Sequence, residues 1–246
     1  MNKVKLPEQP ESEVKEFIKL YEKRPVKNND YGMKSPHLFW CWYILKTLNP
    51  EYIIESGIYK GQGTWIMRQA CPEAKIFSID PILERIEYID SNTVYFKEDF
   101  NDISWEKYLD PQKTLCFFDD HQNAYLRLQQ MYWMNFKLCM FEDNYPAGQG
   151  DCYSMKKIYA QSGLIVDGKE IIRPNSAHKM WIEKNVKEYF ECPPLWKTSK
   201  TRWGDEWNDI DYPSLPALLK EITDKEFEII KEEAKSYTWI CYVELR

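Results

Sequence analysis

The sequence predicts one α/β domain over residues 1–246, with a mostly parallel sheet of seven strands, helices on both faces and a helical extension before the first strand. Three observations lead to this prediction. Short apolar runs alternate with helical patterns, a cluster of glycines follows the first of these runs, and several runs end in acidic residues. The length is sufficient for a sizeable core. We divide the chain into an extension (1–49), a core (50–162) and a C-terminal half (163–246).

Two helices are expected in the extension. The first has an apolar face at helical spacing, formed by Val14, Phe17, Ile18 and Tyr21. The second is expected between Ser35 and Asn49, because a proline follows each of these residues; proline is favoured in the first turn of a helix and ends one that precedes it. His37 and Trp40 lie in the first turns of this helix. They either pack against the sheet or form a roof over a ligand.

The most informative stretch of the core contains a strand, a glycine-rich turn, a helix and a second strand. Apolar and β-branched residues predict the strands at 52–54 and 76–79, and acids follow them, Glu55 and Asp80 respectively. The turn contains Gly57, Gly61 and Gly63. Glycines let the backbone approach a ligand, and the helix that begins at Thr64 offers free N–H groups to a carboxylate or phosphate. A glycine cluster alone also fits an ordinary turn, but together with Asp80, which could bind ribose hydroxyls, it indicates half of a nucleoside-binding unit.

The remaining elements follow in chain order. In the core we expect a short helix (82–88), a strand (93–96), a strand (114–118), a helix (123–134), a strand (138–141) and a helix (151–160). In the C-terminal half we expect a helix (179–189), a short strand (190–192), an aromatic loop (195–216), a helix that starts at a capping box (223–226) and a final strand (237–245).

Acidic residues follow two neighbouring strands of the predicted sheet. The first cluster is Asp119, Asp120 and His121, and the second is Glu142, Asp143 and Asn144. Because ligands bind at the carboxyl ends of parallel strands, both clusters should face the glycine turn across one crevice. Carboxylate and amide oxygens are the ligands that Mg²⁺ prefers, and a histidine titrates near neutral pH. Asp120 and His121 could instead only cap the following helix, but the coincidence of two acid-rich strand ends with the glycine turn favours a function. Glu142 is expected to be a structural acid or one that supports the others.

A family resemblance follows from these residues. The stretch ESGIYKGQGT (55–64) resembles the first motif of class I S-adenosylmethionine-dependent methyltransferases. It has the form found in catechol-type O-methyltransferases and in sugar and macrolide O-methyltransferases related to cephalosporin hydroxylase proteins. The resemblance covers residues 50–162 by motif and the rest by element order, and it implies a Rossmann-like sheet whose last strand is antiparallel. Gly63 departs from the catechol-type motif, which has Ser there, and Thr64 could supply the missing hydroxyl.

The resemblance also implies ligands for a cofactor and a metal. S-adenosylmethionine would be bound by Glu55, Gly57, Tyr59, Gly61, Gly63, Thr64, Asp80, Asp99 and Asp119. Mg²⁺ or another divalent cation would be held by Asp119, Asp143 and Asn144. Gln122 stands where the catechol-type enzymes have a basic Lys, so His121 or Asp120 would act as general base, or the metal alone would acidify the hydroxyl. In the sugar-modifying relatives, a segment similar to 119–121 supplies a histidine base.

These features predict an O-methyltransferase that acts on a hydroxyl of a sugar, a glycan or another small polyol. Aromatic residues of the loop 195–216 could stack on the sugar, pack on the sheet or form a subunit contact; these are Trp196, Trp203, Trp207 and Tyr212. One alternative is a nucleoside-binding scaffold that has lost the reaction, in line with the departures at Gly63 and Gln122. A second is an NAD-dependent oxidoreductase, which the glycine spacing disfavours.

Charge, cysteine spacing and the lengths of the apolar runs restrict the kinds of partner that we expect for this chain. The net charge is −6 and no block of basic residues stands out, which argues against a nucleic-acid partner. The seven cysteines have no metal-binding spacing, which is typical of a reduced, cytoplasmic protein. No apolar run is long enough to span a bilayer and the N-terminus has no apolar leader, so we expect no membrane association. A small-molecule or glycan acceptor is favoured, and a homo-oligomer stays open.

Overall fold

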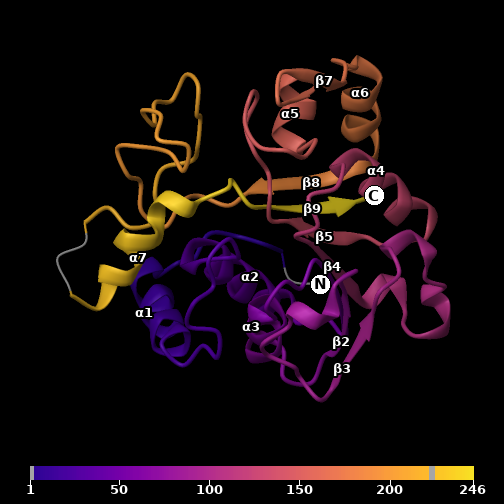
Figure 1. The fold of residues 1–246 in the computed structure, drawn as a ribbon, viewed down its shortest axis with the longest axis horizontal. Coiled ribbons are helices and arrows are strands. Elements are labelled where there is room, and N and C mark those ends of the chain that lie inside the picture. Colours follow the sequence, from indigo (N-terminus) through magenta and orange to yellow (C-terminus); the bar gives the residue numbers. More distant parts are fainter. Residues whose placement is uncertain (1–2, 222–224) are drawn as a thin grey trace.

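The computed structural model describes residues 3–221 and 225–246. Within them the chain forms a seven-stranded sheet of order β3-β2-β1-β4-β5-β9-β8 (Figure 1). The strands are β1 (Tyr52–Ser56), β2 (Lys75–Ile79), β3 (Thr93–Phe96), β4 (Thr114–Phe118), β5 (Leu138–Phe141), β8 (Val186–Glu191) and β9 (Cys241–Leu245). Neighbours are parallel from β3 to β5, whereas β9 runs antiparallel between β5 and β8. The predicted Rossmann-like sheet with an antiparallel last strand is confirmed.

Helices cover both faces of the sheet, because the strand side chains alternate between two apolar clusters. In β4, Leu115 and Phe117 belong to one cluster and Cys116 and Phe118 to the other. The first cluster includes residues of α1 (Pro10–Tyr21), α2 (Ser35–Leu48), α3 (Gln62–Ala70) and α7 (Glu228–Glu233). The second includes residues of α4 (Ala124–Trp133), α5 (Met155–Ala160) and α6 (Ser176–Asn185). Figure 1 shows α1 beside α7, where Tyr21 Oη donates a hydrogen bond to Glu233 (3.0 Å), and α5 beside α6.

The extension packs on the sheet as its apolar patterns predict. The predicted face of α1 is buried, and α2 is buried on nearly all sides. Trp40 is fully buried and its indole Nε1 donates a hydrogen bond to the carbonyl of Pro193 (2.8 Å), so it packs instead of covering a ligand. All seven cysteines are buried and free. Among the helices of residues 3–221 and 225–246, none combines the length and apolarity that a membrane span requires.

Several predicted elements begin or end at other residues in the structure; α3, for example, begins at Gln62 and not at Thr64. Instead of the helix at 82–88 there is one 3₁₀ turn, Leu83–Arg85. The helix predicted at 151–160 begins at Met155, because Ser154 caps it by accepting a hydrogen bond from the Lys157 N–H. The final strand begins at Cys241 instead of residue 237. The predicted capping box (223–226) lies partly outside the described residues. From residue 225 onward, a 3₁₀ turn, Lys225–Phe227, leads into α7.

The segment after α5 differs most from the prediction. A hairpin of β6 (Leu164–Val166) and β7 (Lys169–Ile172) was not expected, although Asp167-Gly168, both at positive φ, is a typical hairpin turn. The helix predicted at 179–189 is α6, which ends at Asn185. Val186 and the residues after it instead form β8, which pairs with β9. The apolar spacing fits a helix, but the available pairing with β9 decides the structure.

Candidate active site

Two adjoining clefts open at the carboxyl ends of the parallel strands. The β2 cleft, of about 450 Å³, is lined by the tips of β1, β2 and β4 and by the loops after them. The β5 cleft, of about 470 Å³, is lined by the start of α2, the tip of β5 and residues of the C-terminal half. The two clefts share Tyr31, Gly32, Asp119 and His121. The glycine turn and both acid clusters therefore lie at one edge of the sheet, as the sequence predicts.

The glycine turn touches the end of β4 so closely that a side chain would not fit. Gly57 has φ +98°, and a Cβ there would lie 2.0 Å from the carbonyl oxygen of Asp119. Gly61 has φ +89°, and its Cβ would lie 2.3 Å from the carbonyl oxygen of Tyr88. Both the conformation and the space therefore require glycine. Gly57 and Tyr59 line the β2 cleft, whereas Gly61 supports the turn from behind.

Asp80 fixes the turn and also lines the β2 cleft. Its Oδ2 accepts hydrogen bonds from the N–H groups of Ile58 and Tyr59, both at 3.0 Å, and its Oδ1 accepts one from Ile82 (2.8 Å). A carboxylate has about four lone-pair sites, so Asp80 can still accept a hydrogen bond from a ligand. The acid at the end of β2 therefore shapes the cleft before any ligand binds.

Glu55, Gly63 and Thr64 lie beneath the turn and do not line either cleft. The fully buried Glu55 Oε2 accepts hydrogen bonds from Thr64 Oγ1 (2.5 Å) and Ser78 Oγ (2.6 Å). Burial raises the pKa of Glu55 to about 7. A Cβ on Gly63 would lie 2.3 Å from Glu55 Oε1, so a larger side chain there would require Glu55 to move. The hydroxyl that Thr64 could supply to a ligand is already bonded to Glu55.

Arg127 joins two acids of the β2 cleft and was not predicted from the sequence. Its guanidinium pairs with both oxygens of Asp99 (2.8 and 2.7 Å), and its Nε donates to Asp120 Oδ2 (3.0 Å). Ser56 Oγ donates to the same Asp120 oxygen (2.7 Å). The bonds from Arg127 hold the pKa of Asp99 below its usual range. The sequence feature that could have indicated a partner for Arg127 is its position near the start of α4, where the helix dipole disfavours a cation.

Asp119, His121 and Asp143 form a cluster in which one ligand atom of each lies within 4.8 Å of the others. His121 Nδ1 lies 3.2 Å from Asp143 Oδ2 and 3.0 Å from Asp151 Oδ1. The bond to Asp151, together with the charge on Asp143, raises the pKa of His121 to about 9. Burial and the Asp143 carboxylate raise the pKa of Asp119 well above its usual range. Asp143 Oδ2 is buried and forms no hydrogen bond of good geometry, so a cation could replace His121 as its positive partner.

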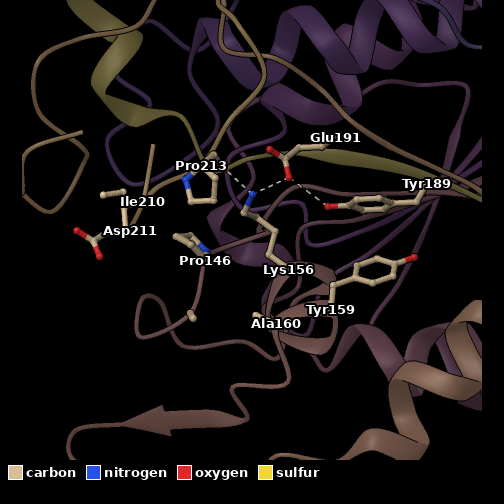
Figure 2. A pocket seen from close by; sticks show the side chains of 10 residues that line it. Pro146, Lys156, Tyr159, Ala160, Tyr189, Glu191, Ile210, Asp211 and Pro213 are labelled. Atoms are coloured by element: carbon tan, nitrogen blue, oxygen red, sulfur yellow. Dashed lines mark hydrogen bonds and ion pairs between the residues drawn. The ribbon is translucent and has the colours of Figure 1, made fainter. Parts of the chain in front are cut away.

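The structure does not bring Asn144 into this cluster. Its side-chain Nδ2 donates to Tyr189 Oη and to the Trp239 carbonyl, both at 2.9 Å, and its Oδ1 accepts from the Lys156 N–H (3.0 Å). Tyr189 and Lys156 line a separate cavity of about 460 Å³, where Figure 2 shows Lys156 between the Glu191 carboxylate and Pro213. None of the predicted site residues lines that cavity. The amide of Asn144 therefore links the end of β5 to α5, β8 and the segment before β9.

A buried pair that sequence reasoning missed forms part of the β5 cleft. His37 Nδ1 lies 3.0 Å from Glu142 Oε1 and accepts a hydrogen bond from the Lys34 N–H (3.3 Å). Burial lowers the pKa of His37 to about 3 and raises that of Glu142. Burial therefore favours the neutral form of each group. His37 Nε2 is buried without a partner, so it is a free polar atom in the cleft wall.

The aromatic loop packs on the sheet and contributes one cation to the β5 cleft. Trp207 stacks on Tyr237, and Trp203 stacks on Trp239. The four aromatic residues named from the sequence, Trp196, Trp203, Trp207 and Tyr212, do not line either cleft. Arg202, which precedes Trp203, does line the β5 cleft. Of the roles expected for these aromatic residues, packing on the sheet is the one that the structure shows.

Comparisons with known proteins add partial structural matches. No family model and no curated protein matches this chain. The solved structures that resemble it include CmcI-N160 without ligand (19% identity, 49% of this chain and 57% of that chain, TM-score 0.39). They also include the S-adenosylhomocysteine-bound methyltransferase PaMTH1 of Podospora anserina (12%, 56% and 62%, TM-score 0.40). A third is a methyltransferase from Geobacter sulfurreducens (12%, 56% and 74%, TM-score 0.37).

The chain spans less than two thirds of the length of the first two of these structures. The structures that it resembles thus include methyltransferases, the class that its first motif resembles. All three TM-scores are below 0.5, so the likeness is partial. The assignment of a function has to rest on the two clefts themselves.

Proposed function

We propose that this chain is an S-adenosylmethionine-dependent O-methyltransferase that methylates a hydroxyl of a sugar, a glycan or another small polyol, with the help of a divalent cation. The observation that carries the proposal is the wall shared by the two clefts. Asp119 and His121 line both, so a methyl donor in the β2 cleft and a hydroxyl in the β5 cleft would meet beside them. Holding two reactants in such a geometry is itself a large part of catalysis.

The β2 cleft suits the cofactor because of its cradle and its acids. Gly57 lets the backbone of the turn contact the end of β4. Tyr59, Asp80 and Asp99 line the β2 cleft. Asp80 and Asp99 would accept hydrogen bonds from ribose hydroxyls and from the adenine amino group respectively. When bound, the cofactor supplies a methyl group on a positively charged sulfur. The chain has to hold this group in line with the acceptor oxygen, which needs orientation more than a strong acid.

The acid cluster suits a divalent cation. Asp119 and Asp143 supply carboxylate oxygens, and a cation could take the place of His121 beside the buried Asp143 Oδ2. Asn144 would take part only if it exchanged its three present hydrogen bonds. A divalent cation held there would supply positive charge that lowers the pKa of a neighbouring hydroxyl and offsets the carboxylates that hold a proton on His121.

His121 is the residue placed to accept the hydroxyl proton. Asp151 orients its ring through Nδ1, which leaves Nε2 for the proton. Asp120 is a poorer base, because Arg127 and Ser56 already occupy its Oδ2. Gln122 lines the β2 cleft but has no group that takes up a proton at neutral pH.

Ligand binding tests the proposal directly. S-adenosylhomocysteine should bind in a calorimetric titration, NAD should not, and Mg²⁺ should increase methyl transfer to members of a panel of sugars and polyols. Ligand at a hundred times its dissociation constant should raise the unfolding free energy by about 2.7 kcal/mol, which a thermal-shift assay detects. The proposal is wrong if S-adenosylhomocysteine does not bind with or without Mg²⁺. Binding without transfer to any hydroxyl would instead favour a scaffold that has lost the reaction.

A further inference from the structure

We propose that the acceptor carries an anionic group, a carboxylate or a phosphate, which Arg202 and Lys235 recognise at the rim of the β5 cleft. This inference rests on the proposed function and narrows its substrate class. The hydroxyl end of the acceptor would lie at Asp119 and His121, and the anionic end at the two cations. All four residues line the same cavity.

Arg202 is held in place by aromatic groups and has donors to spare. Its Nη1 donates to the Tyr145 hydroxyl (3.1 Å), and its guanidinium carbon lies 5.3 Å from the Tyr145 ring centre and 6.0 Å from that of Trp203. Within residues 3–221 and 225–246, no carboxylate forms an ion pair with it. A guanidinium has five N–H donors in a planar fork that fits a carboxylate or phosphate, and stacking reduces the entropy lost when it binds one.

Lys235 and Lys34 reach the same cavity from other parts of the chain. Lys235 lies in the 3₁₀ turn Ala234–Ser236, and Lys34 is the N-cap residue of α2. Lys235 forms no ion pair within the described part of the chain, and Lys34 forms one with the exposed Asp30, at 3.7 Å. Three cations from separate segments thus converge on one cleft of a chain whose net charge is −6. Because the chain as a whole is acidic, an excess of basic residues does not explain why these three cations lie in one cleft.

The acids of the cleft form no described ion pair with these cations. Glu142 has His37 as its partner, at 3.0 Å, although the charge of Arg202 also acts on it. Asp143 has His121 as its ion-pair partner, and no described ion pair joins either Asp119 or Asp143 to Arg202 or Lys235. The positive and negative groups therefore form two parts of the lining of one cavity. A ligand with a hydroxyl at one end and an anion at the other matches both parts, whereas a neutral sugar matches only one.

Paired acceptor analogues test the inference. Glucose, glucuronate and glucose 6-phosphate should be titrated into the protein in the presence of S-adenosylhomocysteine and Mg²⁺. We expect at least one anionic sugar to bind about 10-fold more tightly than glucose, and the better of the two identifies the carboxylate or the phosphate as the preferred group. In R202Q and K235Q this preference should fall to a few-fold. R173Q is the matched control, because Arg173 is exposed on the loop after β7 and pairs with Glu170. This substitution should leave the preference for the anionic sugar unchanged.

The outcomes separate the two proposals. S-adenosylhomocysteine should bind all the variants as it binds the unchanged protein, which also shows that they are folded. If it binds and neither anionic sugar binds better than glucose, including the case in which no sugar binds, the inference is overturned and the proposed function is not. Equal losses of glucose and glucuronate binding in R202Q also overturn the inference. If S-adenosylhomocysteine fails to bind the unchanged protein, the proposed function fails as well.

Discussion

The two clefts are built in different ways, although they share a wall. Most of the β2 cleft comes from turns directly after strands, such as Gly57 after β1 and Asp80 after β2, and backbone N–H groups fix those turns. The β5 cleft combines the tip of β5 with His37, Arg202 and Lys235, from segments far apart in the sequence. Turns at strand ends therefore shape most of the first cleft, and the packing of loops and helices shapes most of the second.

This difference suggests that one cleft binds the cofactor and the other recognises the acceptor. A cleft made mostly of strand-end turns depends mainly on the sheet, so it can keep the same shape around one cofactor. A cleft made of loops and of the helical extension can change when any of these segments changes, which suits recognition of a particular acceptor. Substitutions in the β2 cleft should therefore alter cofactor binding, and those in the β5 cleft should alter acceptor binding. Substitutions in the shared wall should alter the reaction itself.

The largest effect is expected at His121, in the shared wall. In H121N the side chain can no longer accept the hydroxyl proton, and asparagine tolerates the φ of +53° found there. Loss of a general base should lower kcat about 10²- to 10⁴-fold, with little change in the dissociation constant of S-adenosylhomocysteine. Steady-state kinetics and calorimetry measure the two quantities. D151N, which removes only the partner of His121, should lose less activity. A parallel loss of cofactor binding in H121N would mean that His121 belongs to the cofactor site alone.

The next largest effect is expected at Gly57, where the β2 cleft touches β4. G57A places a Cβ 2.0 Å from a backbone oxygen and should cost about 4 kcal/mol of unfolding free energy, together with weaker cofactor binding. G148A is the matched control, because Gly148 also has positive φ but open space around it, and should cost only about 1 kcal/mol. Urea unfolding measures both. Equal costs would show that the contact between the turn and β4 is unimportant.

The same contrast explains what the sequence could predict. The β1 to β5 strands, the glycine turn and the meeting of Asp119 with Asp143 follow from patterns within short windows, so they were predicted. The Arg127 ion pairs, the His37–Glu142 pair and the position of Arg202 depend on which segments pack together, and a single sequence carries no direct signal of this. The structure locates the predicted cofactor and metal ligands, while their roles stay predictions.

Val186 and Asn144 show most clearly what a local sequence pattern cannot predict. Val186 fits the face of a helix by spacing, but β9 offers it a strand partner, so it begins β8. Asn144 follows a strand in the position of a metal ligand, but three partners from other elements bind its amide. In both cases the local pattern was read correctly and a distant segment changed the outcome.

Glu55 tests how the β2 cleft is supported from beneath. Its pKa of about 7 in the folded state lies above the 4.5 of an ordinary glutamate, because burial disfavours its charged form. Its contribution to stability is therefore complete below about pH 4.5 and is lost as the pH rises through 7, a loss of about 3 kcal/mol at about 1.4 kcal/mol per pKa unit. E55Q, which cannot ionise, should lack this loss. Urea unfolding from pH 4.5 to 8 should show the two proteins diverging, whereas parallel curves would mean that Glu55 is charged throughout.

The smallest effect is expected at Asn144, and it decides whether this residue belongs to the metal site or to the scaffold of the β5 cleft. N144A removes three hydrogen bonds and should cost about 2 kcal/mol of unfolding free energy, with little change in Mg²⁺ affinity. D143N removes a carboxylate from the cluster and should weaken Mg²⁺ binding strongly. Calorimetric Mg²⁺ titrations of both variants make the comparison. If N144A weakens Mg²⁺ binding as much as D143N does, Asn144 must turn toward the cluster when the cation binds, and the ligand set predicted from the sequence is the correct one.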